Sequence, residues 1–148
     1  MPLKEMVEYG VIGVLLAMSV IALWAGIERI LFYRQIKLEQ YTNKTELEID
    51  LSKNLTLIAT IGSNAPYVGL LGTVFGIILT FVQLGQSGMV DTASIMTGLA
   101  LALQATAGGL LVAIPSIVFY NLLMRKSEVL VAQWEVLGEK GLLKEGGK

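Results

Sequence analysis

The side chains with the clearest chemical potential in this chain are hydroxyl groups set in long apolar runs. Thr73 and Thr80 lie in the run 66–84, and Thr106 lies in the run 97–124. A threonine hydroxyl donates and accepts hydrogen bonds and orders water, but it cannot carry a proton charge near neutral pH. Inside a membrane, such groups indicate either closely packed helices or a polar path between them.

Small residues accompany these hydroxyls at helical spacing. In the first run they recur at steps of three and four, so they share one helix face. This face holds Gly69, Gly72, Thr73, Gly76, Thr80 and Gln83. A comparable face in the second run holds Ala102, Ala105, Thr106, Gly109, Ala113 and Ser116. Both interpretations stay open here, because such a stripe serves close helix packing as well as a polar conduit.

Ionisable groups are almost absent from this part of the sequence. Between Lys53 and Arg125 the only charged side chain is Asp91, and the whole chain contains no Cys and no His. The sequence offers no thiolate, imidazole or nucleophile–base pair, which argues against an enzyme, a cofactor and a metal site. If protons cross a membrane here, another chain must supply the group that carries them. We expect Glu28 and Asp91 to be solvated charges at helix ends.

Three apolar runs are long enough to cross a bilayer as helices. They cover about 9–27, 66–84 and 97–124, and a bilayer core of roughly 30 Å needs about 20 helical residues. A cleaved signal peptide is the alternative for the first run, but its leader carries Glu5 and Glu8 beside Lys4. With 148 residues, 54% of them hydrophobic, and a net charge of −1, the chain is predicted to be a single all-α membrane domain with no nucleic-acid surface.

Positive charges predict the orientation of these spans. The segment 28–61 contains five Lys and Arg residues, the loop between the second and third spans contains none, and the tail 125–148 contains five. Positive residues in short loops stay in the cytoplasm. We therefore expect a periplasmic N-terminus and a cytoplasmic C-terminus.

The segment 28–61 is predicted to be helical and cytoplasmic. Thr42 and Asn43 mark a break, with Asn43 capping a new helix. A one-sided apolar stripe follows, formed by Leu47, Leu51, Leu55 and Ile58. We expect this helix to continue into the second span, with Pro66 starting or kinking its membrane part. The tail 125–148 is expected to extend the third span and to pack in the cytoplasm, ending at Gly138 and Gly141.

Two sequence blocks resemble the MotA/TolQ/ExbB proton-channel family. The first is APYVGLLGTVFG at 65–76, and the second comprises ATAGGL at 105–110 and AIPSIVFYN at 113–121. The blocks fall on the second and third spans in the expected order, and the resemblance covers almost the whole chain. Within the family the chain is most similar to ExbB of the TonB system, in a short form.

The resemblance implies a subunit of the cell inner membrane that assembles with copies of itself and with two partners. An ExbD-like single-span protein supplies an intramembrane Asp as the proton carrier, and a TonB-like protein receives the motion. The ring, expected to be a pentamer embedded in membrane lipid, surrounds the ExbD-like helices with its second and third spans.

The resemblance also assigns roles to individual residues. Thr73 and Thr106 match the family's membrane threonines, and with Thr80 and Gln104 they are expected to line the proton path. The family's prolines correspond to Pro66 and Pro115, which are expected to kink their helices. Six small residues are expected to pack around the partner helix: Gly69, Gly72, Gly76, Ala102, Gly109 and Ala113.

Two features depart from the family pattern. ExbB and TolQ members carry a Glu early in the third span where this chain has Leu101, and Gln104 is a candidate replacement one turn further in. The segment 28–61 is also short, which argues against the flagellar-motor branch. The expected function is that of a proton-channel subunit that drives TonB-dependent import across the outer membrane. A TolQ-like cell-envelope motor and a non-conducting scaffold for partner helices are the alternatives.

Overall fold

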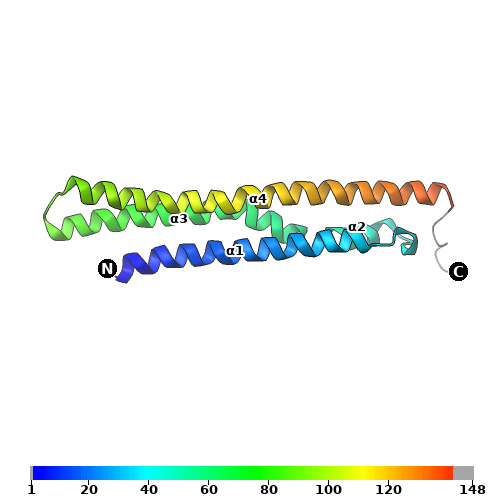
Figure 1. Ribbon diagram of the computed structural model, residues 1–148, viewed down its shortest axis with the longest axis horizontal. Helices are drawn as coiled ribbons and strands as arrows, with labels where there is room; N and C mark the ends of the chain where they lie inside the picture. The colour runs from blue at the N-terminus through cyan, green and yellow to red at the C-terminus, as the bar shows by residue number, and fades with distance from the viewer. Residues whose placement is uncertain (1, 142–148) are drawn as a thin grey trace.

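Residues 2–141 fold into five helical elements joined by short turns (Figure 1). The computed structural model describes residues 2–141. In chain order the elements are α1 (Pro2–Gln35), the short 3-10 helix η1 (Leu38–Gln40), α2 (Lys44–Ser52), α3 (Leu55–Ser87) and α4 (Thr92–Glu139). Every regular element in this range is helical, which confirms the predicted all-α fold.

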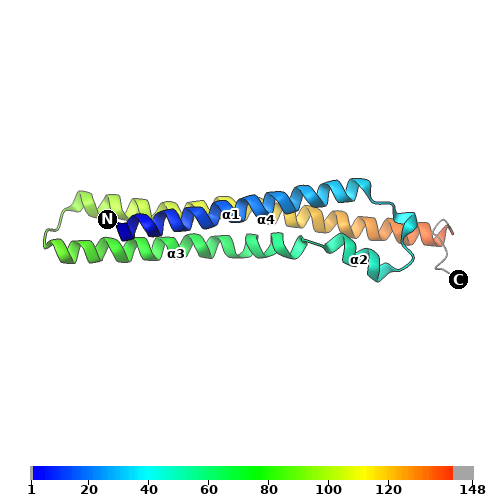
Figure 2. The ribbon, with the colours of Figure 1, turned by 90° about the horizontal axis from the view of Figure 1, so that it is seen from below.

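Among residues 2–141, three helices are long and apolar enough to cross a membrane: Leu3–Gln35, Leu55–Ser87 and Thr92–Glu139. This number agrees with the three predicted spans. α3 and α4 form an antiparallel hairpin, and α1 lies alongside both (Figure 2). α4 has 48 residues, so it is about 72 Å long, more than twice the roughly 30 Å of a bilayer core. It therefore continues beyond the apolar layer, and the predicted range 97–124 is only its middle part.

The turn between α3 and α4 has a cap at each helix end. Gly88 ends α3 in a left-handed conformation (φ 65°), and its N–H donates to the Leu84 carbonyl at 3.2 Å. Asp91 begins α4 by accepting from the Ala93 N–H at 3.2 Å and from the Ser94 hydroxyl at 2.7 Å. The Ser94 hydroxyl, and then the Ala93 N–H, hold the pKa of the Asp91 carboxyl below its ordinary value. Asp91 is thus an exposed charge at a helix end, as predicted.

The predicted stripe before the second span is confirmed, but its helix is interrupted. Asn43 caps α2 by accepting from the Thr45 N–H at 2.8 Å. The four stripe residues are all buried: Leu47, Leu51, Leu55 and Ile58. The expectation that α2 continues into α3 is wrong, because Asn54 adopts a left-handed backbone with φ 66°. Asn tolerates this conformation better than most residues, and its side-chain amide donates to Glu28 at 3.2 Å.

Both span prolines, Pro66 and Pro115, lie inside long helices. α3 begins at Leu55, before Pro66, as expected, and the start or kink of the membrane part at Pro66 and the kink at Pro115 stay predictions. α4 ends between Gly138, which is still helical, and Gly141, which has a left-handed φ of 69°. Residues 142–148 of the predicted tail lie outside the described part of the chain.

Polar contacts tie the last turns of α4 to the connection between α1 and α2. The Trp134 indole N–H donates to the Tyr41 carbonyl at 3.0 Å, and Lys44 pairs with Glu135 at 2.7 Å. The Tyr41 hydroxyl donates to Asp50 at 2.7 Å. Burial, and then this hydrogen bond, raise the pKa of Tyr41 to about 12. The extension of α4 therefore packs on the segment before α3, as expected.

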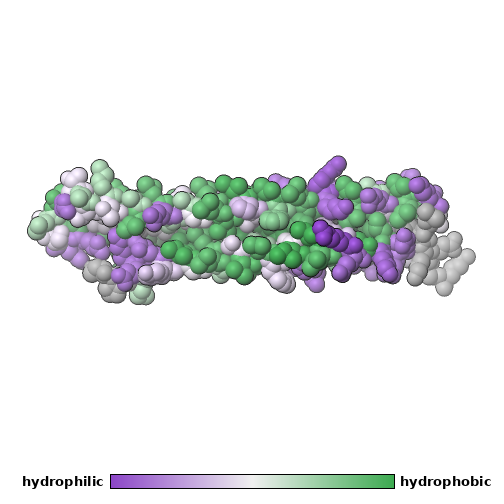
Figure 3. Space-filling view, in the orientation of Figure 1, coloured by the Kyte–Doolittle hydropathy of each residue, from purple (hydrophilic) through white to green (hydrophobic). Residues whose placement is uncertain are grey.

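The bundle combines buried clusters with an apolar outer surface. One cluster, around Leu15, Ala65 and Ala113, packs α1 against α3 and α4. A larger one surrounds Leu47 and Leu51 and joins all four α-helices. Hydrophobic residues cover the middle of the face in Figure 3, and hydrophilic residues gather towards both ends. This distribution suits a protein whose middle faces lipid or other membrane helices.

Candidate functional site

Small residues let the backbones of α3 and α4 touch. A Cβ atom built on Gly69 would lie 2.5 Å from the Ala105 carbonyl oxygen and 3.0 Å from Gly109 Cα. A Cβ atom built on Gly109 would in turn lie 2.6 Å from the Ala65 carbonyl oxygen and 3.0 Å from Gly69 Cα. Only residues without a side chain allow two helices to approach this closely.

The same contact continues towards the α3–α4 turn. A Cβ atom on Gly76 would lie 2.8 Å from Ala102 Cβ, and one on Gly72 would lie 2.9 Å from Val11 of α1. Ala113 is buried in the cluster that α1 makes with α3 and α4. These small residues therefore pack helices within one chain. Their packing around a partner helix stays a prediction.

Two threonine hydroxyls bridge α3 and α4 beside this contact. Thr73 is buried, and its hydroxyl lies 2.9 Å from the Ala102 carbonyl oxygen and in hydrogen-bond contact with the Thr106 hydroxyl. A hydroxyl has one hydrogen to donate. If Thr73 donates to Ala102, Thr106 must donate to Thr73, and both lone pairs of the Thr106 oxygen are then available as acceptors. The half-buried Thr106 can therefore accept from water or from a protonated acid.

α1 covers one side of the α3–α4 pair and leaves Thr106 on the other. A Cβ atom on Gly108 would lie 3.3 Å from Leu15 of α1. Thr106 precedes Gly108 by two positions, which places it about 200° away around the helix axis. On that side it is flanked one turn before and one turn after by Leu103 and Leu110, which are 59% and 44% exposed.

A polar cleft lies on the same side of the pair, towards the end of the bundle that holds α2. It has a volume of about 510 Å³. Polar side chains of both helices line it: Thr56, Thr60, Ser63 and Asn121. Ile117, also in its lining, shares a helix face with Thr106 about three turns earlier. This cleft was not predicted from the sequence, although three hydroxyls at steps of four and three precede Pro66 on one helix face.

Thr80 lies at the same helix contact but not in the hydroxyl pair. Its buried hydroxyl donates within α3, to the Gly76 carbonyl at 2.8 Å. A Cβ atom on Gly98 of α4 would lie 2.6 Å from it. Thr80 therefore packs against a glycine of the opposite helix, two turns away from Thr73.

Gln104 and Leu101 are exposed on α4. Gln104 is two positions from Thr106, so its side chain leaves the helix about 200° away from that of Thr106. The structure thus brings together Thr73 and Thr106, and it does not bring Gln104 to them.

A buried arginine that the sequence analysis did not single out fixes the break between α2 and α3. Arg29 is 1% exposed, and its guanidinium donates at 2.5 Å to each Glu28 carboxylate oxygen and to the Asp50 carbonyl. The Tyr33 hydroxyl donates to the Leu51 carbonyl at 2.5 Å. These carbonyls belong to the last turn of α2, which lacks partners within the helix. Glu28 is therefore held in an ion pair, which corrects the expectation of a solvated charge.

The sequence matches the MotA/TolQ/ExbB proton channel family over residues 24–136. It is 55% identical over 135 residues to the biopolymer transport protein ExbB of Aquifex aeolicus, with 91% of each chain covered. An ExbB-like biopolymer transport protein of Helicobacter pylori is 59% identical over 134 residues, covering 90% of this chain and 89% of that protein. The Tol-Pal system protein TolQ of Pseudomonas aeruginosa is 40% identical over 93 residues, covering 63% of this chain and 40% of that protein.

Proposed function

Because this chain belongs to the MotA/TolQ/ExbB proton channel family, and is thus a multi-pass inner-membrane protein, we propose that it forms the channel wall of a proton-driven motor. With an ExbD-type partner it couples the proton motive force to TonB-dependent import across the outer membrane. The observation that carries the proposal is the Thr73–Thr106 hydroxyl pair, because the half-buried Thr106 oxygen keeps the capacity to accept a further hydrogen bond. The region that matches this chain covers 91% of the Aquifex ExbB but only 40% of the Pseudomonas TolQ, which favours a role in the TonB system over one in the Tol system.

The proton carrier in this mechanism is the intramembrane Asp of the partner. Its carboxylate takes a proton from the periplasmic side and becomes a neutral acid, which crosses the apolar layer far more easily than the charged form. The neutral acid donates a hydrogen bond to the Thr106 oxygen as it passes. The proton then leaves towards the polar cleft of Thr56, Thr60, Ser63 and Asn121. One charge crossing 100 mV releases about 2.3 kcal/mol.

The basic residues support the orientation proposed for the chain. The segments 28–61 and 125–148 each hold five Lys and Arg residues, whereas the α3–α4 turn holds none. This distribution favours a periplasmic N-terminus and a cytoplasmic C-terminus. The polar cleft then opens near the cytoplasmic border, as an exit for protons requires.

The shape of one chain supports a ring of copies as part of this proposal. The Thr106 side of the α3–α4 pair is a single open face flanked by exposed leucines, and one face cannot surround a partner helix. Several copies arranged around an axis, five by the resemblance to ExbB, enclose the path and cover the apolar surface.

Substituting the two threonines by valine tests the proposal. Valine keeps the shape and removes only the hydroxyl, and an interhelical hydrogen bond in a membrane contributes about 0.6 kcal/mol on average. We expect Thr73→Val and Thr106→Val to co-purify with the ExbD-type partner in normal amounts and to lose most proton-gradient-dependent uptake. Thr97→Val is the matched control, because its exposed hydroxyl donates only to the Ala93 carbonyl of its own helix, at 2.9 Å.

Two results would count against this mechanism. Normal uptake by both variants means that the hydroxyl pair serves only packing. Loss of partner co-purification in both variants means that the pair holds the fold or the assembly together rather than the proton path.

A further inference from the structure

A second cleft lies between α1 and α4 where the apolar surface meets the charged end of the bundle. It has a volume of about 330 Å³. Its apolar walls include Ile30 of α1 and Phe119 and Leu122 of α4, and its two charged lining residues are Arg34 and Lys126. The cleft is separate from the Thr73–Thr106 pair, because it lies on the side of α4 that faces α1.

At this cleft, α1 and α4 each place an apolar side chain and, one turn later, a positively charged side chain. Arg34 follows Ile30 by four positions on α1, and Lys126 follows Leu122 by four positions on α4. Residues four apart share a helix face, one turn above the other. Each cation therefore stands one turn beyond an apolar side chain of the cleft, and Leu122 is 64% exposed.

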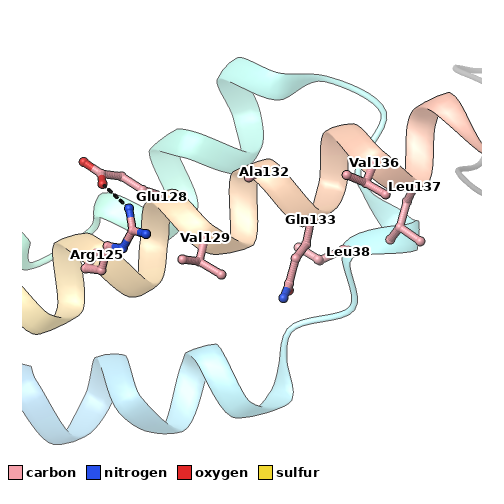
Figure 4. A pocket seen from close by; sticks show the side chains of 8 residues that line it. All are labelled: Leu38, Arg125, Glu128, Val129, Ala132, Gln133, Val136 and Leu137. Atoms are coloured by element: carbon pink, nitrogen blue, oxygen red, sulfur yellow. Dashed lines mark ion pairs between the residues drawn. The ribbon is translucent and has the colours of Figure 1, made fainter.

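Within the described range 2–141, the two cations of the cleft have no acidic partner. Among residues 2–141 the ion pairs involve Arg29, Lys44 and Arg125, and the lining of the cleft contains no carboxylate. The neighbouring pocket along α4 differs in this respect, because Arg125 pairs there with Glu128 at 3.8 Å (Figure 4). The cleft of Arg34 and Lys126 thus combines an apolar wall with two cations that no carboxylate of its lining compensates.

We propose that this cleft binds one anionic phospholipid of the cytoplasmic leaflet. The phosphate lies between the Arg34 guanidinium, whose planar fork matches phosphate oxygens, and the Lys126 ammonium. The acyl chains run along Phe119 and Leu122 into the apolar layer. Basic clefts between membrane helices on the cytoplasmic side bind such headgroups. The bound lipid bridges α1 and α4, since the lining of the cleft comes from these two helices.

This inference rests on the membrane insertion and orientation given above, and not on proton coupling. The probe is phosphatidylglycerol added to the purified full-length assembly in a neutral detergent. Binding is counted by native mass spectrometry, and stabilisation is followed as the unfolding midpoint. Phosphatidylcholine and glycerol 3-phosphate serve as the neutral lipid and the soluble phosphate.

We expect phosphatidylglycerol to bind and to raise the unfolding midpoint of the parent. The double variant Arg34→Gln/Lys126→Gln should bind it about 30-fold more weakly, because each cation near an anionic headgroup contributes about a factor of five. The control Lys37→Gln/Arg125→Gln removes the same charge from the same end of the bundle and should keep the binding. The midpoints of both variants in phosphatidylcholine report whether they are folded.

Three results would overturn the proposal. Equal weakening in both double variants indicates general attraction to a positive surface. Unchanged binding in Arg34→Gln/Lys126→Gln places the lipid elsewhere. Stabilisation by glycerol 3-phosphate equal to that by phosphatidylglycerol indicates a site for soluble phosphate.

Discussion

Adding one methyl group at Gly69 tests whether the contact between α3 and α4 governs the stability of the chain. The new Cβ would lie 2.5 Å from the Ala105 carbonyl oxygen and 3.0 Å from Gly109 Cα. Both are backbone atoms of α4, so no side chain can turn aside and the helices must separate. Overpacking of this kind costs about 1–3 kcal/mol, whereas Gly→Ala in a helix otherwise gains about 0.5–1 kcal/mol. We therefore expect Gly69→Ala to lose about 1–2 kcal/mol net.

The free energy of unfolding in a detergent titration measures this loss. Gly85→Ala is the matched control, because nothing lies within 4 Å of a Cβ built there, and it should keep or slightly raise the stability. Gly109→Ala should cost as much as Gly69→Ala. The double variant should cost less than both together, because one methyl group already parts the helices. A Gly69→Ala chain as stable as the parent would refute the close contact and, with it, the position of the hydroxyl pair.

Further expectations concern the buried arginine, the orientation and the α3–α4 turn. Arg29→Met should lower the free energy of unfolding by about 1–3 kcal/mol, because carbonyls of the last turn of α2 lose their donor. Arg29→Lys should recover only part of this stability. An unchanged free energy of unfolding in both variants would contradict the role of the guanidinium. In this cysteine-free chain, Ser87→Cys should react with an impermeant thiol reagent from outside, and Ser52→Cys only after permeabilisation; the reverse pattern would invert the topology. The pKa of Asp91 is lower in the folded chain than its ordinary value of about 3.9. The ionised Asp91 therefore stabilises the folded chain above that ordinary pKa, and this stabilisation is lost as the pH falls through the pKa of the folded state. Asp91→Asn, still a good cap, should flatten this acid dependence of the unfolding midpoint, and an unchanged acid limb would refute it.

Local signals explain what could be predicted from the sequence. Long apolar runs predict the three spans because their length matches the bilayer. Asn43 predicts the start of α2 because an N-cap needs only the next few backbone N–H groups. The stripe from Leu47 to Ile58 predicts burial because helical periodicity is local.

The features that the sequence could not supply depend on the register between helices. Gly69 and Gly109 are forty positions apart, and nothing local shows that they touch. The left-handed backbone of Asn54 is supported by Glu28 of another helix. The local sequence therefore fits a continuous helix through this position as well as it fits a break. Gln104 was chosen for its place in the sequence, yet two positions turn it about 200° from Thr106.

The polar cleft was missed for a related reason. Its hydroxyls on α3 precede the apolar run 66–84, and Asn121 comes from the opposite helix. Because α3 begins before its membrane part, it brings these hydroxyls next to the proposed proton path. Side-chain polarity alone does not fix where the apolar layer of the membrane begins along the helix.

The most direct test of the central claim is proton flux into liposomes that hold this chain with and without its ExbD-type partner. A pH-sensitive dye inside the vesicles reports the flux after a potential is applied. The account predicts no flux above empty vesicles for the chain alone, because its membrane path offers hydroxyls and no ionisable carrier. It predicts flux when the partner is present, and loss of that flux when the partner's intramembrane Asp is replaced by Asn. Proton flux through this chain alone would contradict the account.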